Sequence, residues 1–249
     1  MPHFFVKSDN IKDNSIIISD NENYRHIAKS LRAKIGEKLL LIDENKFQYE
    51  TEITAIDSQT IETKICKKYL SKKILDFDLY LAQSPLRSDA QSFITEKAAE
   101  LGIKGLYPIL TDNCALSKTV IVKKILKWQK IMYEAAKQCE RCTIPECFEL
   151  MTLEKLLSIP EKFDKIIAFT ERDNDMTLHE FFEKSHVKQG ESLLVIIGPE
   201  GGFSAREFEF FKKENIPRLT LGNLILKAET AVTVALGNII YEFENYRKN

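Results

Sequence analysis

Short runs in which apolar and polar positions alternate fill the first seventy residues. Asp, Asn and Ser residues of the kind found in turns separate these runs. Because successive side chains of a strand point to opposite faces, the pattern predicts several short β-strands in a small sheet or barrel. The predicted strands are 15–19, 37–43, 47–56 and 60–68.

One segment of this region has helical spacing instead. Between Asn21 and Gly36, apolar residues recur three and four positions apart, which predicts an amphipathic helix with one buried face. Gly36 is the expected stop, because glycine commonly follows the last turn of a helix. The predicted buried face consists of Tyr24, Ile27, Ala28 and Leu31.

From about residue 73 the pattern changes to strongly apolar runs that alternate with longer amphipathic segments. The predicted strands are 75–85, 104–112, 165–171, 191–200 and 217–222, and the predicted helices are 88–103, 120–142 and 230–246. Strands that alternate with helices predict an α/β domain whose mostly parallel sheet is covered on both faces. We therefore expect two domains, 1–72 and 73–249.

A glycine-rich loop, GPEGG (198–202), follows the most apolar run, 193–197. Ligands of parallel α/β proteins bind beyond the carboxyl ends of the strands, and glycine lets a ligand approach the backbone closely. Ser204 and Glu207 have the spacing of a capping box, so the next helix should begin at Ser204. The loop matches no phosphate-binding motif, and Glu200 would repel a phosphate. A neutral or cationic ligand fits better, and a purely structural turn is the alternative.

A second predicted strand also ends at a glycine, Gly222. An irregular linker follows, and then a helix whose first turn contains Glu229 and Thr230. The functional interpretation is a second ligand-binding loop, 222–226, beside the first. The alternative is structural, because a glutamate near a helix N-terminus is favoured by the helix dipole alone.

Composition and charge narrow the choice of partner. Apolar residues make up 44% and charged residues 29% of the 249 residues, which is typical of a globular protein with a buried core. The formal net charge is −1, so any nucleic acid must be bound by local basic patches. Five cysteines, an odd number, favour a reducing cytoplasm over a disulfide framework. We expect no membrane partner, since no apolar run approaches bilayer length and the N-terminus lacks a secretory signal pattern.

Five motifs together resemble those of one known family. They are HIAKSLRAKIGEKLLLID (26–43), EKAAELGIKGLYPI (96–109), WQKIMYEAAKQCERCTIPE (128–146), IIGPEGGFS (196–204) and LGNLILKAETA (221–231). Their sequences and order are similar to those of the bacterial 16S ribosomal RNA uracil-N3 methyltransferases, which belong to the SPOUT class. Two positions depart from the family pattern, because Lys227 and His3 stand where arginine is usual.

The resemblance implies a PUA-like β-barrel at the N-terminus that helps to grip RNA. It also implies a C-terminal α/β domain with a mostly parallel sheet and a trefoil knot in its backbone. The enzyme would be a homodimer that binds S-adenosylmethionine, without a metal, through the loops 168–171, 197–202 and 221–226. The residues expected to bind this cofactor are Thr170, Ile197, Gly198, Gly201, Gly202, Leu221, Gly222, Leu224 and Leu226.

The implied reaction is methylation of N3 of one uridine in 16S ribosomal RNA, within the small ribosomal subunit. Because N3 bears a proton of low acidity, a base or a nearby cation should promote the transfer. Arg141 is expected to position the uridine or its phosphate with help from Lys227, although a cation at a helix end also stabilises the helix dipole. The expected catalytic residues are Arg141, Glu200, Lys227 and Glu229.

RNA contacts are expected from two basic patches, within 25–38 and 118–141, although either is equally typical of a solvated helix face. The residues expected to contact RNA are Arg25, Lys29, Arg32 and Gln138. Cys139, Cys142 and Cys147 invite a metal interpretation, but their spacing matches no zinc motif, so free cysteines are favoured. Two rival functions remain, namely a SPOUT methyltransferase acting on another ribosomal or transfer RNA nucleotide, and a non-catalytic RNA-binding assembly factor.

Overall fold

The computed structural model describes residues 1–159 and 163–248, which form two compact units. The first unit contains Met1–Ile74 together with the later segment Ala136–Thr143. The second contains Leu75–Ala135 and the chain from Ile144 onward. The first unit is therefore completed by a segment that lies far away in the sequence.

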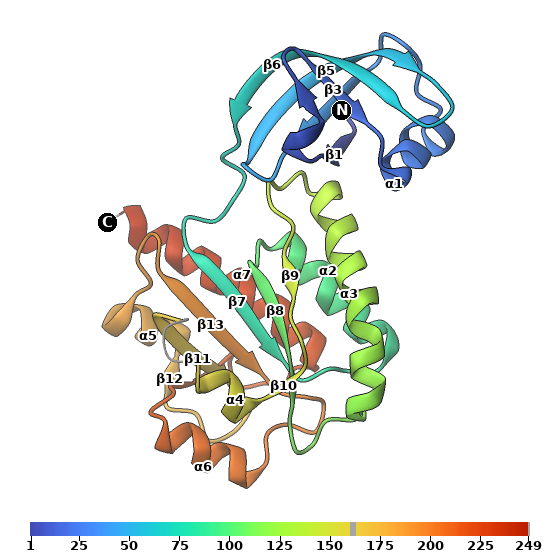
Figure 1. Cartoon of the computed structure of the whole chain (residues 1–249). Helices are drawn as coiled ribbons and strands as arrows, with labels where there is room; N and C mark the ends of the chain where they lie inside the picture. Colours follow the sequence, from blue (N-terminus) through green and yellow to red (C-terminus); the bar gives the residue numbers. More distant parts are fainter. Residues whose placement is uncertain (160–162, 249) are drawn as a thin grey trace. The chain divides into compact units, whose positions relative to one another are not determined.

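A six-stranded sheet with the order β1-β4-β5-β6-β3-β2 makes up most of the first unit (Figure 1). All its neighbouring strands are antiparallel except β1 and β4. Its strands are β1 (His3–Phe5), β2 (Ile11–Lys12), β3 (Ser15–Ile18), β4 (Lys38–Ile42), β5 (Phe47–Ile56) and β6 (Ile61–Leu70). The four strands predicted from alternation are confirmed, whereas β1 and β2 are too short to produce a pattern.

The predicted helix between Asn21 and Gly36 is shorter than expected. Asp20 caps α1 (Asn21–Tyr24) by accepting a hydrogen bond from the Asn23 backbone N–H, and the chain continues as a π-helix, Arg25–Ser30. Arg32 then has φ 52°, a left-handed conformation that ends the helix four residues before Gly36. Leu31, predicted to be buried, is consequently 44% exposed.

The second unit is built on an eight-stranded sheet in which every described pair is parallel. Its order is β10-β8-β7-β13-β11-β14-β12, and β9 pairs with β8. The strands are β7 (Asp78–Gln83), β8 (Gly105–Leu110), β9 (Glu146–Cys147), β10 (Met151–Thr152), β11 (Lys165–Phe169), β12 (Met176–Thr177), β13 (Ser192–Ile197) and β14 (Arg218–Thr220). The predicted mostly parallel sheet is confirmed.

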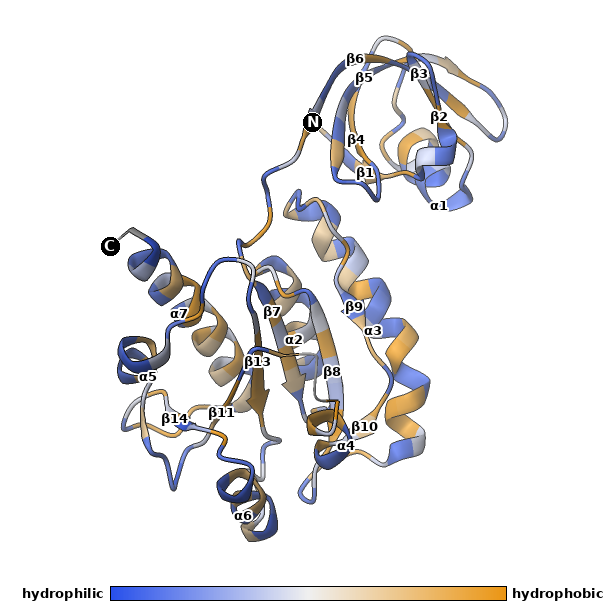
Figure 2. Cartoon of the chain, turned by 60° about the vertical axis from the view of Figure 1, so that its left-hand side comes forward, coloured by the Kyte–Doolittle hydropathy of each residue, from blue (hydrophilic) through white to orange (hydrophobic). Residues whose placement is uncertain are grey.

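Helices cover both faces of this sheet, as the apolar strands predicted. Leu193, Val195 and Ile197 of β13 pack in one core, and the alternate residues Leu194 and Ile196 pack in another. Helices α2, α3, α5 and α7 contribute to the first core, and α4 and α6 contribute to the second. Their bounds are α2 (Ser88–Glu100), α3 (Lys118–Gln138), α4 (Leu153–Leu157), α5 (Leu178–Ser185), α6 (Ala205–Lys213) and α7 (Ala228–Lys248). Figure 2 shows the hydrophobic colour along β13 between these layers.

Helix α3 ends at Gln138, four residues before the predicted end, because Glu140 adopts φ 56° and turns the chain. None of the helices that the structure describes combines the length and the apolar character needed to cross a membrane.

Candidate functional site

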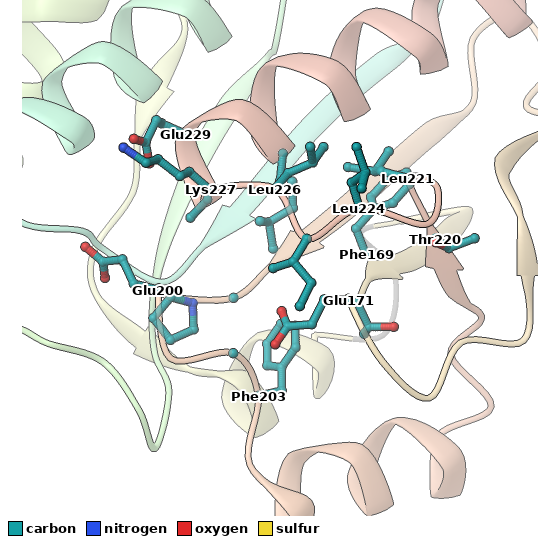
Figure 3. A pocket seen from close by; sticks show the side chains of 18 of the residues that line it. Phe169, Glu171, Glu200, Phe203, Thr220, Leu221, Leu224, Leu226, Lys227 and Glu229 are labelled. Carbon is teal, nitrogen blue, oxygen red and sulfur yellow. The ribbon is translucent and has the colours of Figure 1, made fainter.

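A cavity of about 490 Å³ lies at the carboxyl end of the parallel sheet (Figure 3). Its walls come from the segments that follow strands β13, β11 and β14. These three strands are neighbours in the sheet, with β11 in the middle. The lining segments fall within 169–171, 197–203 and 220–231, and Ala90 of α2 completes the wall. The two glycine-bearing loops, predicted to be neighbours, therefore face one cavity.

The first loop is anchored by the helix that follows it. The Ser204 hydroxyl accepts a hydrogen bond from the Glu207 N–H, and the Glu207 carboxylate accepts one from the Ser204 N–H, so the predicted capping box is confirmed. The Ser204 hydroxyl also donates to Asp112, which follows β8, at 2.5 Å, and the Asp112 N–H donates to Glu207 at 3.0 Å. Arg206 and Ser204, as hydrogen-bond donors, hold the pKa of Asp112 below its ordinary value. This network connects the end of the first loop to the segment that follows β8.

Asn113 fixes the same loop from its other end. Its side-chain N–H group donates to the carbonyl oxygens of Gly201 at 3.3 Å and of Gly202 at 3.1 Å. Gly201 is not among the residues that line the cavity, and its backbone faces Asn113 instead. Gly202 lines the cavity with φ +68°, and a Cβ there would lie 2.7 Å from the carboxylate oxygen of Glu171. The positive φ favours glycine at position 202, whereas the Glu171 carboxylate is the end of an exposed side chain that can move.

The second loop is a tight turn closed by a threonine. The Thr220 hydroxyl accepts a hydrogen bond from the Gly222 N–H and donates to the Gly222 carbonyl, both at 3.0 Å. Gly222 has φ +118°, a conformation available to glycine alone among common residues. Beyond it, Leu224 is 81% exposed and Ile225 is 68% exposed, and both line the cavity. The loop therefore offers apolar side chains and backbone groups to a ligand.

The cavity brings together most of the residues predicted to bind a cofactor. Among the described lining residues are Thr170, Ile197, Gly198, Gly202, Leu221, Gly222, Leu224 and Leu226. The Thr170 hydroxyl oxygen is buried and has no hydrogen-bond partner within the described parts of the chain. Because a buried polar atom normally has a partner, this hydroxyl fits a ligand that supplies one. Thr170 and the open backbone of the two loops suit a nucleoside-containing cofactor such as S-adenosylmethionine.

Charged side chains lie at two places around the cavity (Figure 3). Glu200, Lys227 and Glu229, three of the four predicted catalytic residues, lie toward one edge, and Glu171 lies across from them beside Phe203. Glu171 falls in the expected cofactor loop 168–171, but sequence reasoning assigned it no role of its own. The signal that could have found Glu171 is its position just after an apolar strand, at the carboxyl end of the sheet. The glycine loops were recognised by the same signal.

Arg141, the fourth predicted catalytic residue, is not among the residues that line the cavity. It belongs to the segment Ala136–Thr143 of the first unit, where it is buried and donates to the Thr143 hydroxyl at 3.2 Å. Burial lowers the pKa of its guanidinium group. Lys137 is buried as well, so the second basic patch loses two of its expected members. The charged residues of this segment are not a solvated helix face.

The residues predicted to contact RNA are accessible. Arg25, Lys29 and Arg32 are exposed on the segment that follows α1, and Gln138 is exposed at the end of α3. His3, in contrast, is buried in the first unit, and burial lowers the pKa of its imidazole group. A phosphate contact from position 3 is therefore not expected.

The five cysteines are free thiols, and Cys142 and Cys147 are buried. Burial raises the pKa of Cys147 to about 12, so this thiol stays protonated at neutral pH. No cluster of three or more His, Cys, Asp or Glu side chains arranged to hold a metal ion occurs in 1–159 or 163–248.

Known RNA methyltransferases are similar to this chain over almost its whole length. Ribosomal RNA small subunit methyltransferase E of Bacillus subtilis is 26% identical over 99% of both chains, and that of Aquifex aeolicus is 29% identical over 97% of this chain and 100% of the relative. A crystal structure of the enzyme of this name from Neisseria gonorrhoeae, bound to S-adenosylmethionine, has a TM-score of 0.82 at 23% identity over 96% of both chains. That likeness shows a common fold.

Family models match both parts of the chain. The PUA domain of RNA methyltransferases matches residues 18–66, and the RNA methyltransferase domain matches residues 73–240. The second match alone covers about two thirds of the sequence and includes all the segments that line the cavity. The chain therefore belongs to the RNA methyltransferase family.

Proposed function

We propose that this protein is an S-adenosylmethionine-dependent methyltransferase that modifies N3 of one uridine in 16S ribosomal RNA of the small subunit. The observation that carries the proposal is the single cavity enclosed by two glycine-bearing loops, with the unpartnered Thr170 hydroxyl in its wall. Relatives that span almost the whole chain are named as small-subunit ribosomal RNA methyltransferases, which supports the substrate. A cytoplasmic location agrees with this substrate.

The fold supports finer proposals. We propose that 1–72 closes as a PUA-like barrel and that the backbone of 73–249 is tied in a trefoil knot. The order of the sheet, in which β11 lies between the two later strands β13 and β14, is compatible with such a knot. We also propose a homodimer, with the cavity near the subunit interface.

The residues of the cavity have three tasks in this reaction. When bound, S-adenosylmethionine supplies a methyl group on a positively charged sulfur, so no covalent enzyme intermediate is required. The two loops hold this group in place through backbone N–H and C=O groups, which lowers the entropic part of the barrier. Lys227 stabilises the negative charge that develops on the uracil ring as N3 loses its proton. Glu200 and Glu229 lie at the same edge, where they can accept this proton directly or through water.

A methylation assay tests the function and the position together. Small subunits from cells that lack this enzyme activity are incubated with S-adenosylmethionine and the protein, and modified nucleotides are mapped by reverse transcription. Methylation of N3 removes the group that pairs with adenine, so a stop at one uridine is expected. Naked 16S RNA and transfer RNA serve as parallel substrates.

Each outcome of this assay has a clear meaning. A methyl group on another ribosomal or transfer RNA nucleotide would overturn the proposed substrate and keep the chemistry. Tight binding of RNA without any methyl transfer, and without binding of S-adenosylmethionine in a calorimeter, would instead favour an assembly factor.

A further inference from the structure

Glu171 is a charged residue of the cavity to which the mechanism above gives no task. It follows Thr170 at the end of β11, so the fold delivers it to the same wall as the unpartnered hydroxyl. Figure 3 shows its carboxylate inside the cavity beside Phe203, on the side away from Lys227. Its position is therefore set by the sheet itself, not by a long flexible loop.

The carboxylate of Glu171 lies close to Gly202 of the first loop. A Cβ at Gly202 would lie 2.7 Å from its Oε1 atom and 3.4 Å from its carboxyl carbon, so this carboxylate lies against the first loop. Within 1–159 and 163–248, no hydrogen bond or ion pair is made to Glu171. Because Glu171 is exposed and lines the cavity, its carboxylate can meet a positive or hydrogen-bonding group of a ligand that enters there.

The charges around the cavity favour a positive group. Among the described lining residues, Glu171, Glu200 and Glu229 are negative and Lys227 is positive. Figure 3 shows Lys227 beside Glu229, with Glu171 on the other side of the cavity. The acids of the lining therefore outnumber its cations by three to one.

The reaction proposed above changes the charge of the ligand in this cavity. The bond between the methyl carbon and sulfur breaks, the bond between that carbon and N3 forms, and the N3 proton leaves to Glu200 or Glu229, directly or through water. The sulfur keeps the electron pair of the broken bond, so a cationic sulfonium becomes a neutral thioether in S-adenosylhomocysteine. Substrate and product share the adenosine, the ammonium and the carboxylate, and they differ at the sulfur by one methyl group and one charge.

We propose that Glu171 is a specificity residue that favours the charged methyl donor over the neutral product. It does so by facing the sulfonium across the cavity. This inference rests on the proposed function. The electrostatic attraction of Glu171 helps to retain the donor before transfer, and its loss after transfer helps the product to leave. Glu171 takes no part in breaking or forming a bond.

The test compares two ligands that differ in this charge. Dissociation constants for S-adenosylmethionine and S-adenosylhomocysteine are measured by calorimetry for the wild type, Glu171→Gln, Glu171→Asp and Glu209→Gln. Glu209 is the matched control, because it lies on α6 of the same unit, is mostly exposed and does not line the cavity. Glu171→Gln should lower the preference for the donor about two- to fivefold, the range expected for one partly exposed charge pair. Glu171→Asp should keep most of the preference, and Glu209→Gln should keep all of it.

A second measurement uses the wild type alone and does not depend on the folding of any variant. Because salt screens charges, raising the ionic strength from about 0.01 M to about 1 M should reduce the preference for the donor over the product. A preference that is unchanged by both Glu171→Gln and salt would overturn the inference. So would an equal loss of affinity for both ligands in Glu171→Gln, which would assign the carboxylate to a group that they share. Failure of the wild type to bind either ligand would instead refute the proposed function itself.

Discussion

Replacing Asn113 with alanine should weaken binding of the methyl donor without removing any residue that lines the cavity. Asn113 follows β8, and its side chain donates to the Gly201 and Gly202 carbonyls, 88 and 89 positions later in the chain. In Asn113→Ala the loop loses both hydrogen bonds and samples more conformations. The ligand must then order the loop when it binds, and this ordering costs free energy that the wild type does not spend.

The size of this effect follows from the two distances. A typical hydrogen bond contributes about 0.5–1.5 kcal/mol net, and bonds at 3.1 Å and 3.3 Å are at the long end of the usual range. We therefore assign about 1 kcal/mol to the pair, which corresponds to a roughly fivefold higher Kd for S-adenosylmethionine. With both substrates saturating, kcat should stay within about twofold, because the bound ligand orders the loop again.

Calorimetry for Kd and steady-state methylation kinetics for kcat measure the two quantities. Asn45→Ala is the control, since Asn45 is exposed and lies in the first unit, and it should leave both unchanged. An unchanged Kd in Asn113→Ala would refute the view that this contact shapes the loop. A large loss of kcat at unchanged Kd would instead place Asn113 at the RNA.

Three further changes have defined outcomes. Gly202→Ala places an alanine in a left-handed conformation that costs about 1–2 kcal/mol, so calorimetry should show donor affinity at least fivefold lower. Gly190→Ala is the control, because Gly190 has φ +82° with open space around it and lies away from the cavity. It introduces the same strain and should leave donor binding unchanged. Lys227→Met should lower kcat by about tenfold or more with little change in donor Kd, whereas Lys227→Arg keeps the charge and should retain most activity in the methylation assay. Asp112→Asn should be less stable than the wild type at neutral pH. Because the hydrogen bonds of Arg206 lower the folded-state pKa of Asp112, the stability that they add is present above the unfolded-state pKa and is lost as pH falls through the folded one. The difference between the two melts should therefore be constant above about pH 4 and shrink as pH falls below it. A difference that persists undiminished well below about pH 4 would contradict the assignment.

Local signals in the sequence predicted much of the fold and of the cavity. Alternation and apolar runs identified the main strands, because they reflect which face each residue buries. The capping box at Ser204 and Glu207 located the start of α6, since both of its hydrogen bonds are made within four residues. The two glycine loops were recognised because their composition departs from that of the surrounding elements.

Contacts between distant segments could not be predicted in this way. Nothing in the residues around Asn113 indicates that its side chain reaches Gly201, because that contact depends on the order of the strands in the sheet. The burial of Lys137 and Arg141 was missed for the same reason, since their helical spacing is typical of an exposed basic face. The early end of the helix after Asn21 depends on one left-handed residue, Arg32, whose type gives no warning.

A crystal structure of the protein with S-adenosylmethionine tests the central claim most directly. The account predicts the adenosyl group between residues 198–202 and 221–226, with the Thr170 hydroxyl donating to or accepting from it and the sulfonium facing Glu171. Density for the cofactor at another place, with both loops empty, would contradict the assignment of this cavity and of every residue role that depends on it.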